Sequence, residues 1–155
     1  SSAKMIGWGS LYWYHELTYI VSNSSISFNG KCGILVEKGA NPHIFKNIIE
    51  KNLGQGILLT EGSSAFIEKN EICSNIKANI ALGGRCSINT TIIENKIRGG
   101  KCEGIFTIYG ERLLITNNEI SRNNQGIVAV TSVPRIEGNT ISLNETNGVL
   151  LVRDC

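Results

Sequence analysis

The chain has 155 residues, 41% of them hydrophobic, which suits one hydrophobic core and leaves no room for a second domain of ordinary size. Its formal net charge is +2 and its lysines and arginines are scattered, so we expect no nucleic-acid binding. It has no signal peptide and no apolar run of about 18 residues, so we also expect no membrane insertion.

The first 19 residues differ in composition from the rest of the chain. They contain both tryptophans and three of the four tyrosines, namely Trp8, Tyr12, Trp13, Tyr14 and Tyr19. A repeat protein needs its terminal repeat covered, so we expect residues 1–19 to form an aromatic-rich cap or an irregular first coil. Trp8 and Trp13 are also candidate partner-binding residues.

Residues 20–155 contain six copies of a repeat of 21–25 residues. One polar column marks the copies: Ser24, Asn47, Asn70, Asn95, Asn118 and Asn139. An isoleucine follows two residues later in every copy: Ile26, Ile49, Ile72, Ile97, Ile120 and Ile141. A second column comprises Asn29, Asn52, Asn75, Gly100, Asn123 and Asn144, and a third comprises Gly33, Gly56, Asn79, Gly104, Gly126 and Gly148.

The spacing of the apolar residues predicts strands. Pairs such as Ile57 and Leu59 alternate with period two, whereas a helix needs apolar positions at i, i+3 and i+4. Leucine-rich repeats share the period, but their framework is leucine and they usually carry a helical outer segment. We therefore predict an all-β fold, a single-stranded parallel β-helix (solenoid) of about six coils over residues 20–155. We expect it to be right-handed, as parallel crossovers generally are.

In such a solenoid, equivalent residues lie above one another at about 4.8 Å, so side-chain amides can bond along the stack. We predict a structural ladder of Asn47, Asn70, Asn95, Asn118 and Asn139. We also expect these asparagines to adopt the left-handed backbone conformation that a sharp corner demands. In the next column, Glu71, Lys96 and Glu119 place opposite charges on neighbouring coils, where exposed pairs are worth about 0.2–1 kcal/mol each.

An apolar column is expected on the outer surface. The residues between the inward pairs should point outward, and they are apolar in all six copies: Leu35, Leu58, Ala81, Phe106, Val128 and Leu150. A continuous apolar stripe of this kind is typical of a covered or binding surface. Either the N-terminal segment or another part of the chain lies across it, or it binds a partner protein.

The sequence contains few candidate catalytic residues. Polysaccharide lyases and hydrolases of this architecture need aspartates that hold calcium, or paired carboxylates, and Asp154 is the only aspartate among 13 acidic residues. His15 and His43 stand alone in the sequence. We therefore predict no catalytic residue, no cofactor and no metal site, and a protein that is not an enzyme.

The five cysteines, at positions 32, 73, 86, 102 and 155, are odd in number and have no CxxC spacing. Buried, reduced thiols explain them most simply, so we expect a cytoplasmic or otherwise intracellular protein. No equivalent of the N-terminal cap follows Cys155, and we expect further chain or another subunit to cover that end.

The string Asn-Pro-x-Ile-x-x-Asn-x-Ile at residues 41–49, with Gly-Ile at 56–57 and Glu-Lys-Asn-Glu-Ile at 68–72, resembles right-handed parallel β-helix repeats. These belong to the carbohydrate-binding/sugar-hydrolase-like and pectin-lyase-like group, and the closest likeness is to the β-helix domain of eukaryotic F-box proteins. That resemblance implies a non-catalytic substrate-recognition module, although no F-box helices are present here.

We predict a non-enzymatic scaffold or recognition module that binds protein. Two alternatives remain open: a polysaccharide-binding or degenerate carbohydrate-active β-helix, and an architectural component of a large cytosolic or cytoskeletal assembly.

Overall fold

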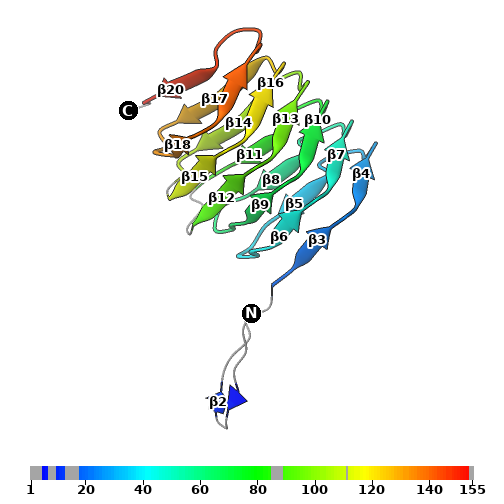
Figure 1. Ribbon diagram of the computed structural model, residues 1–155, viewed down its shortest axis with the longest axis vertical. Helices are drawn as coiled ribbons and strands as arrows, with labels where there is room; N and C mark the ends of the chain where they lie inside the picture. Colours follow the sequence, from blue (N-terminus) through cyan, green and yellow to red (C-terminus); the bar gives the residue numbers. More distant parts are fainter. Residues whose placement is uncertain (1–4, 7–9, 13–17, 85–88, 111, 154–155) are drawn as a thin grey trace.

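The computed structural model describes residues 5–6, 10–12, 18–84, 89–110 and 112–153, and within them every regular element is a strand. The strands wind into a stack of coils, each of which gives one strand to each of three parallel sheets (Figure 1). We name each sheet after its first strand.

The β3 sheet consists of β3 (Ile20–Ser22), β6 (His43–Phe45), β9 (Phe66–Glu68), β12 (Thr90–Ile93), β15 (Leu113–Thr116) and β18 (Arg135–Glu137). The β4 sheet consists of β4 (Ser25–Ser27), β7 (Ile48–Glu50), β10 (Glu71–Cys73), β13 (Lys96–Arg98), β16 (Glu119–Ser121) and β19 (Thr140–Ser142). The β5 sheet consists of β5 (Ile34–Val36), β8 (Ile57–Leu59), β11 (Ile80–Leu82), β14 (Glu103–Ile108), β17 (Gln125–Val130) and β20 (Val149–Val152).

The predicted register is confirmed across the stack. Ile26 pairs with Ile49, and the same column continues to Ile141 through parallel pairs in every coil. The architecture is therefore the predicted parallel β-helix of six coils, with three strands in each coil. Outside the coils, β1 (Met5–Ile6) and β2 (Ser10–Tyr12) pair antiparallel with each other.

The core is a stack of mostly branched aliphatic side chains, at least one from each strand of the β3 and β4 sheets and two from strands of the β5 sheet such as β8 and β11. Ile44, Ile49 and Ile57 of the second coil have no accessible surface, and Ile67 and Ile72 of the third coil are equally buried. Burying such a side chain stabilises the fold by about 1.5–3 kcal/mol. Because the β-branched residues fit a pleated surface, the same positions favour strand and core together.

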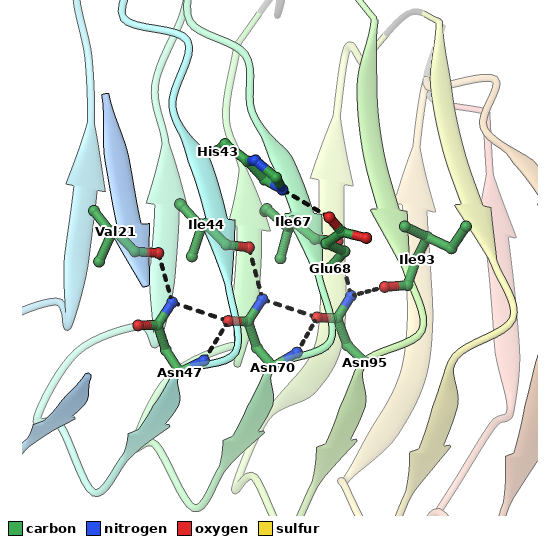
Figure 2. A network of polar contacts seen from close by, with 9 residues as sticks. All are labelled: Val21, His43, Ile44, Asn47, Ile67, Glu68, Asn70, Ile93 and Asn95. Carbon is green, nitrogen blue, oxygen red and sulfur yellow. Dashed lines mark hydrogen bonds and ion pairs between the residues drawn. The ribbon is translucent and has the colours of Figure 1, made fainter. Parts of the chain in front are cut away.

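The predicted asparagine ladder is present between the β3 and β4 sheets (Figure 2). The side-chain Nδ2 of Asn47 donates to Oδ1 of Asn70 at 3.0 Å, and Nδ2 of Asn70 donates to Oδ1 of Asn95 at 3.0 Å. Each of these oxygens also accepts the backbone N–H of the preceding rung at 2.9 Å. Each Nδ2 bonds a strand carbonyl as well, as Asn70 does to Ile44 at 3.0 Å. The ladder continues through Asn118 to Asn139.

The prediction that the ladder asparagines adopt the left-handed backbone conformation is wrong. The left-handed residue is the one before each ladder position, as at Lys46 (φ 59°), Lys69 (φ 57°) and Glu94 (φ 59°). The turn made by that residue aims the next side chain into the stack, where it meets the backbone N–H of the coil before. The asparagines stabilise the corner by hydrogen bonding, and their neighbours bear the unfavourable backbone conformation.

The second ladder, between the β4 and β5 sheets, contains one exchanged rung. Asn75 donates through Nδ2 to Oδ1 of Asn79 at 2.8 Å, and Asn79 donates through Nδ2 to Oδ1 of Asn123 at 2.9 Å. Asn79 belongs to the third column, which is otherwise glycine, and it replaces the rung that is missing at Gly100. Its side chain spans the gap between the third and fifth coils.

Close packing explains why Asn79, the exception in the third column, occurs together with Gly100, the exception in the second column. A Cβ atom at Gly33 would lie 2.9 Å from Nδ2 of Asn52, so a third-column side chain collides with the second-column asparagine of the next coil. Gly100 occupies the second-column position in the coil after Asn79. Because it has no side chain, it leaves room for the side chain of Asn79. Conversely, a Cβ atom at Gly100 would lie 2.9 Å from Nδ2 of Asn79.

This pairing predicts strong coupling between positions 79 and 100. Asn79→Gly should destabilise the fold by about 1–3 kcal/mol, because it removes buried hydrogen bonds from the backbone N–H and Nδ2 of Asn75 and from Oδ1 of Asn123. Gly100→Asn should also destabilise it through the steric conflict with Asn79. The double variant restores the regular pattern of both columns and should regain most of the loss. Urea unfolding of the four proteins measures the coupling, and additive effects would contradict the exchanged-rung explanation.

Candidate protein-binding face

The predicted apolar column lies on the outer face of the β5 sheet. Its members pair directly from strand to strand, beginning with Leu35 and Leu58, then Ala81 and Phe106. In β8, Leu58 is partly exposed between Ile57 and Leu59, both of which are fully buried. The alternation that we inferred from the sequence is therefore the one that the sheet adopts.

The accessible surface of the column is uneven. Leu35 is 52% exposed, and Leu58, Phe106 and Leu150 are half-buried. Ala81 and Val128 are each only 5% exposed, so they contribute almost nothing to the surface. The larger side chains of the column therefore project on both sides of Ala81 and Val128, which form two low points in the surface. The predicted continuous stripe is interrupted at these two residues.

A second apolar column widens this face over the last three coils. Ile108 of β14 pairs with Val130 of β17, which pairs with Val152 of β20. Each lies two residues after a member of the first column, on the same side of its strand. Beside the first column is a shallow hollow of about 260 Å³, lined in part by Ala81, Phe106 and the more polar Lys77. The outer face of the β5 sheet is apolar along its centre and polar at this margin.

The outer face of the β3 sheet carries an aromatic cluster that the sequence analysis missed. The ring of His43 lies 4.1 Å from that of Phe45 and 4.8 Å from that of Phe66, measured between centroids. Nε2 of His43 lies 2.8 Å from Oε2 of Glu68 (Figure 2). These four residues occupy the columns two and four positions before the ladder asparagines. These columns of the repeat could have predicted that His43 lies beside Phe45, Phe66 and Glu68.

The outer face of the β4 sheet is charged. Glu71, Lys96 and Glu119 are direct neighbours in the register, as predicted. The ion pair of Glu71 is nevertheless with Arg98, at 3.0 Å, because the longer guanidinium reaches it diagonally from two positions along β13. Both partners are more than one third exposed, so the pair contributes at most about 1 kcal/mol.

Cys73 lies on the β4 face between Glu50 and Arg98 and is only 7% exposed. Burial raises the pKa of its thiol above the ordinary value; the Arg98 cation opposes this shift, and a 3.5 Å hydrogen bond to Glu50 adds to it. The thiols of Cys32 and Cys102 are also free. The raised pKa of Cys73 is the opposite of the depressed pKa that marks an activated thiol.

Several sequence predictions lie outside the described residues. Trp8 and Trp13 are among them, and so are His15, Cys86 and Asp154. Tyr19, at the end of the aromatic segment, is 60% exposed. Figure 1 shows the β1–β2 hairpin beyond the first coil, away from β8 and β14, which carry Leu58 and Phe106.

Within the part of the chain that the structure describes, no three His, Cys, Asp or Glu side chains gather into a possible metal site. In the same part, no helix is long and apolar enough to span a membrane. On the described β3 and β4 faces the charged groups form two pairs, His43 with Glu68 and Glu71 with Arg98.

Comparison with protein families matches residues 32–155 to the right-handed β-helix region family. The chain belongs to this family. The predicted hand of this β-helix is thereby confirmed, together with the general part of the resemblance drawn from its repeats. Comparison with curated proteins yields no significant sequence match.

Two solved structures resemble this β-helix. The A-module of the Azotobacter vinelandii mannuronan C-5 epimerase AlgE6 superposes with a TM-score of 0.72 at 16% identity, over 86% of this chain and 39% of that one. The A-module of AlgE4 from the same organism gives a TM-score of 0.60 at 17% identity, over 88% of this chain and 53% of that one. At such identity the likeness establishes the fold alone. This β-helix spans about half or less of either module.

The environment of Cys73 gives a test of the β4 face. Glu50→Gln should lower the pKa of the thiol, because it removes a carboxylate that disfavours the thiolate, and alkylation at pH 8 should become faster. Arg98→Met should raise the pKa and slow the reaction. Mass spectrometry of the peptide that contains Cys73 measures both rates. Glu145→Gln, in the last coil, is the control and should leave the rate unchanged; unaltered rates in all three variants would contradict the described contacts.

Proposed function

We propose that this β-helix is a non-catalytic scaffold or recognition module that binds a protein through the outer face of its β5 sheet. The observation that carries the proposal is the apolar column on that face. Leu35, Leu58, Phe106 and Leu150 present aliphatic or aromatic groups in a row, where a solvent-facing column of a sheet is ordinarily polar. A row of this kind is larger than scattered surface residues explain.

The chemistry of the column favours an apolar protein partner. No member is charged, and Ala81 and Val128 form low points between larger neighbours, into which partner side chains can pack. The polar margin, with Lys77 beside the hollow, resembles the rim that surrounds the apolar centre of many interfaces. The partner should therefore present an apolar row of its own, from a strand or from one face of a helix.

The finer parts of the proposal concern its setting. The resemblance to the β-helix domain of F-box proteins implies that the bound protein is a substrate selected for a ligase. An intracellular location belongs to the same proposal, and the free thiols of Cys32, Cys73 and Cys102 are compatible with it. Permanent membership of a cytosolic or cytoskeletal assembly would use the same face with a longer-lived partner.

A second candidate, polysaccharide binding, is favoured by the β3 face. Phe45, Phe66 and His43 form a ring cluster, and Glu68 adds hydrogen-bonding oxygens, a combination of apolar surface and convergent polar groups that suits a sugar. The two structural neighbours are by name mannuronan epimerases, which makes mannuronan the first polysaccharide to test.

The primary test is affinity capture from lysate, followed by titration of the purified partner. The parent chain is compared with Leu58→Asp/Phe106→Asp, in which two carboxylates replace the centre of the β5 face. Burying them at an interface should lower the affinity at least tenfold. The matched control is Ile48→Asp/Phe66→Asp, which places the same charges on the β4 and β3 faces.

Loss of a partner with the first pair, and its retention with the control, supports the proposal. A partner that still binds the Leu58→Asp/Phe106→Asp variant with full affinity contradicts the β5 face as the binding surface. Circular dichroism must show the same sheet content in all three proteins. Titration with mannuronan is the parallel test. If the β3 face binds polysaccharide, the parent and the Leu58→Asp/Phe106→Asp variant should bind mannuronan, and the Ile48→Asp/Phe66→Asp control should not.

A further inference from the structure

The turns between the β4 and β5 sheets carry one positive charge in each of the four inner coils. The residues are exposed and lie within two positions of the second ladder: Lys51, Lys77, Lys101 and Arg122. They are scattered in the sequence, but stacking gathers them into one row, at steps of about 4.8 Å along the stack. We call this row the basic edge. Its coils have a neighbouring coil on both sides, so it belongs to the body of the stack.

The cations of the basic edge have no acidic partner. Among the described residues, none of the ion pairs includes a member of the edge. Two carboxylates lie at its margins. Glu50 accepts a hydrogen bond from the thiol of Cys73 on the β4 face, and Glu103 lines the hollow beside Lys77. Positive charge therefore exceeds negative charge along the edge.

The edge between the β3 and β4 sheets also has lysines, but it balances them. Lys46, Lys69 and Lys96 lie there in the second, third and fourth coils, and the surface that they line also contains Glu71 and Glu94. The two edges thus have the same number of lysines in these coils, and the basic edge has no carboxylate interleaved with them. A row of this kind attracts anions and speeds the association of an anionic partner.

Apolar side chains lie among the cations in two of the coils. Leu53 is 62% exposed and Ile76 is 38% exposed, and they follow Asn52 and Asn75 at the same position of successive turns. The turns of the four inner coils contain no aromatic residue on which nucleic-acid bases could stack. Membrane binding scales with the apolar area buried, and two side chains supply little of it. The edge therefore suits a peptide that has carboxylates and a few apolar groups.

The length of the row fits an extended acidic segment. From Lys51 to Arg122 the row rises by three coils, or about 14 Å. On one face of an extended strand the side chains recur every ~6.8 Å, so three alternate carboxylates span the same length. We propose that the basic edge binds an extended acidic segment of a partner protein. Alternate carboxylates of the segment face the four cations, and its apolar groups pack against Leu53 and Ile76.

This inference goes beyond the proposed function, because it assigns a surface that contains no residue of the apolar column. The basic edge borders the β5 face at the hollow lined by Lys77 and Phe106. One partner can therefore place an apolar row on the sheet and an acidic segment on the edge, and an acidic segment can also bind the edge alone. The experiment changes no residue of the β5 face, so its failure and the failure of the proposed function are distinguishable.

The test titrates the whole chain with two synthetic peptides and follows binding by calorimetry. One peptide has about eight residues of alternating glutamate and threonine, and the other has glutamine in place of each glutamate. The edge variant is Lys51→Gln/Lys77→Gln/Lys101→Gln. The matched control, Lys46→Gln/Lys69→Gln/Lys96→Gln, removes the same charge from the same three coils at the other edge. All six side chains are exposed, so both variants should remain folded, which circular dichroism checks.

The parent and the control should bind the glutamate peptide with the same affinity, and the edge variant should bind it about tenfold more weakly, because it lacks three exposed pairs of modest strength. Raising sodium chloride from about 0.05 M to about 0.3 M should weaken binding to the parent. The glutamine peptide should not bind.

A parent chain that does not bind the glutamate peptide would overturn the proposal. So would an equal loss of affinity in the edge variant and the control, because net charge alone would then explain binding. Vesicles of phosphatidylserine and phosphatidylcholine, and an oligothymidylate, are titrated in parallel. If either binds the parent more tightly than the glutamate peptide does, and is lost in the edge variant alone, the edge recognises lipid or nucleic acid and the proposal is wrong.

Discussion

The hydrogen bonds of the asparagine ladders hold each coil to the next, and every other feature of the fold depends on the register that they set. Oδ1 of Asn95 accepts both the side chain and the backbone N–H of Asn70, while its own Nδ2 bonds Oδ1 of Asn118. Each amide therefore satisfies a corner that would otherwise bury unpaired polar groups. Among the described residues, every buried side-chain nitrogen and oxygen has a partner.

A fixed register gives the three outer faces their distinct chemistries. Because side chains alternate along a strand, a shift of one residue would exchange the core for the surface. The observed register instead gathers apolar groups on the β5 sheet, rings around His43 on the β3 sheet, and charges around Arg98 on the β4 sheet. The proposed binding face thus consists of residues that are 21 to 25 positions apart in the chain and adjacent in space.

The strand pairing could be predicted from the sequence because the repeat itself displays it: Ile26, Ile49 and their successors recur at the spacing at which they pair. The left-handed residues could not be found in this way, since Lys46, Lys69 and Glu94 share no side-chain chemistry that marks the conformation. The sequence also did not predict that Glu71 pairs with Arg98, because the length of the side chain decides whether a direct or a diagonal neighbour makes the ion pair.

The exchanged rung and the aromatic cluster were missed for different reasons. Asn79 and Gly100 were visible as exceptions in two columns, but only their proximity shows that one exception compensates for the other. His43, Phe45, Phe66 and Glu68 were each read singly, although their columns follow from the same repeat. In the apolar column, the low exposure of Ala81 and Val128 depends on the size of their neighbours, which periodicity does not report.

Hydrogen exchange of the asparagine side chains, followed by nuclear magnetic resonance, tests most directly whether the ladders hold the stack. The Nδ2 protons of Asn70, Asn95 and Asn118 should exchange only when the whole domain unfolds, with the same protection as the core amides of Ile72 and Ile97. Those of the exposed Asn147 should exchange rapidly. Rapid exchange of the Asn95 side chain in the folded protein would contradict the account, because the corner would then be held by something other than its amide.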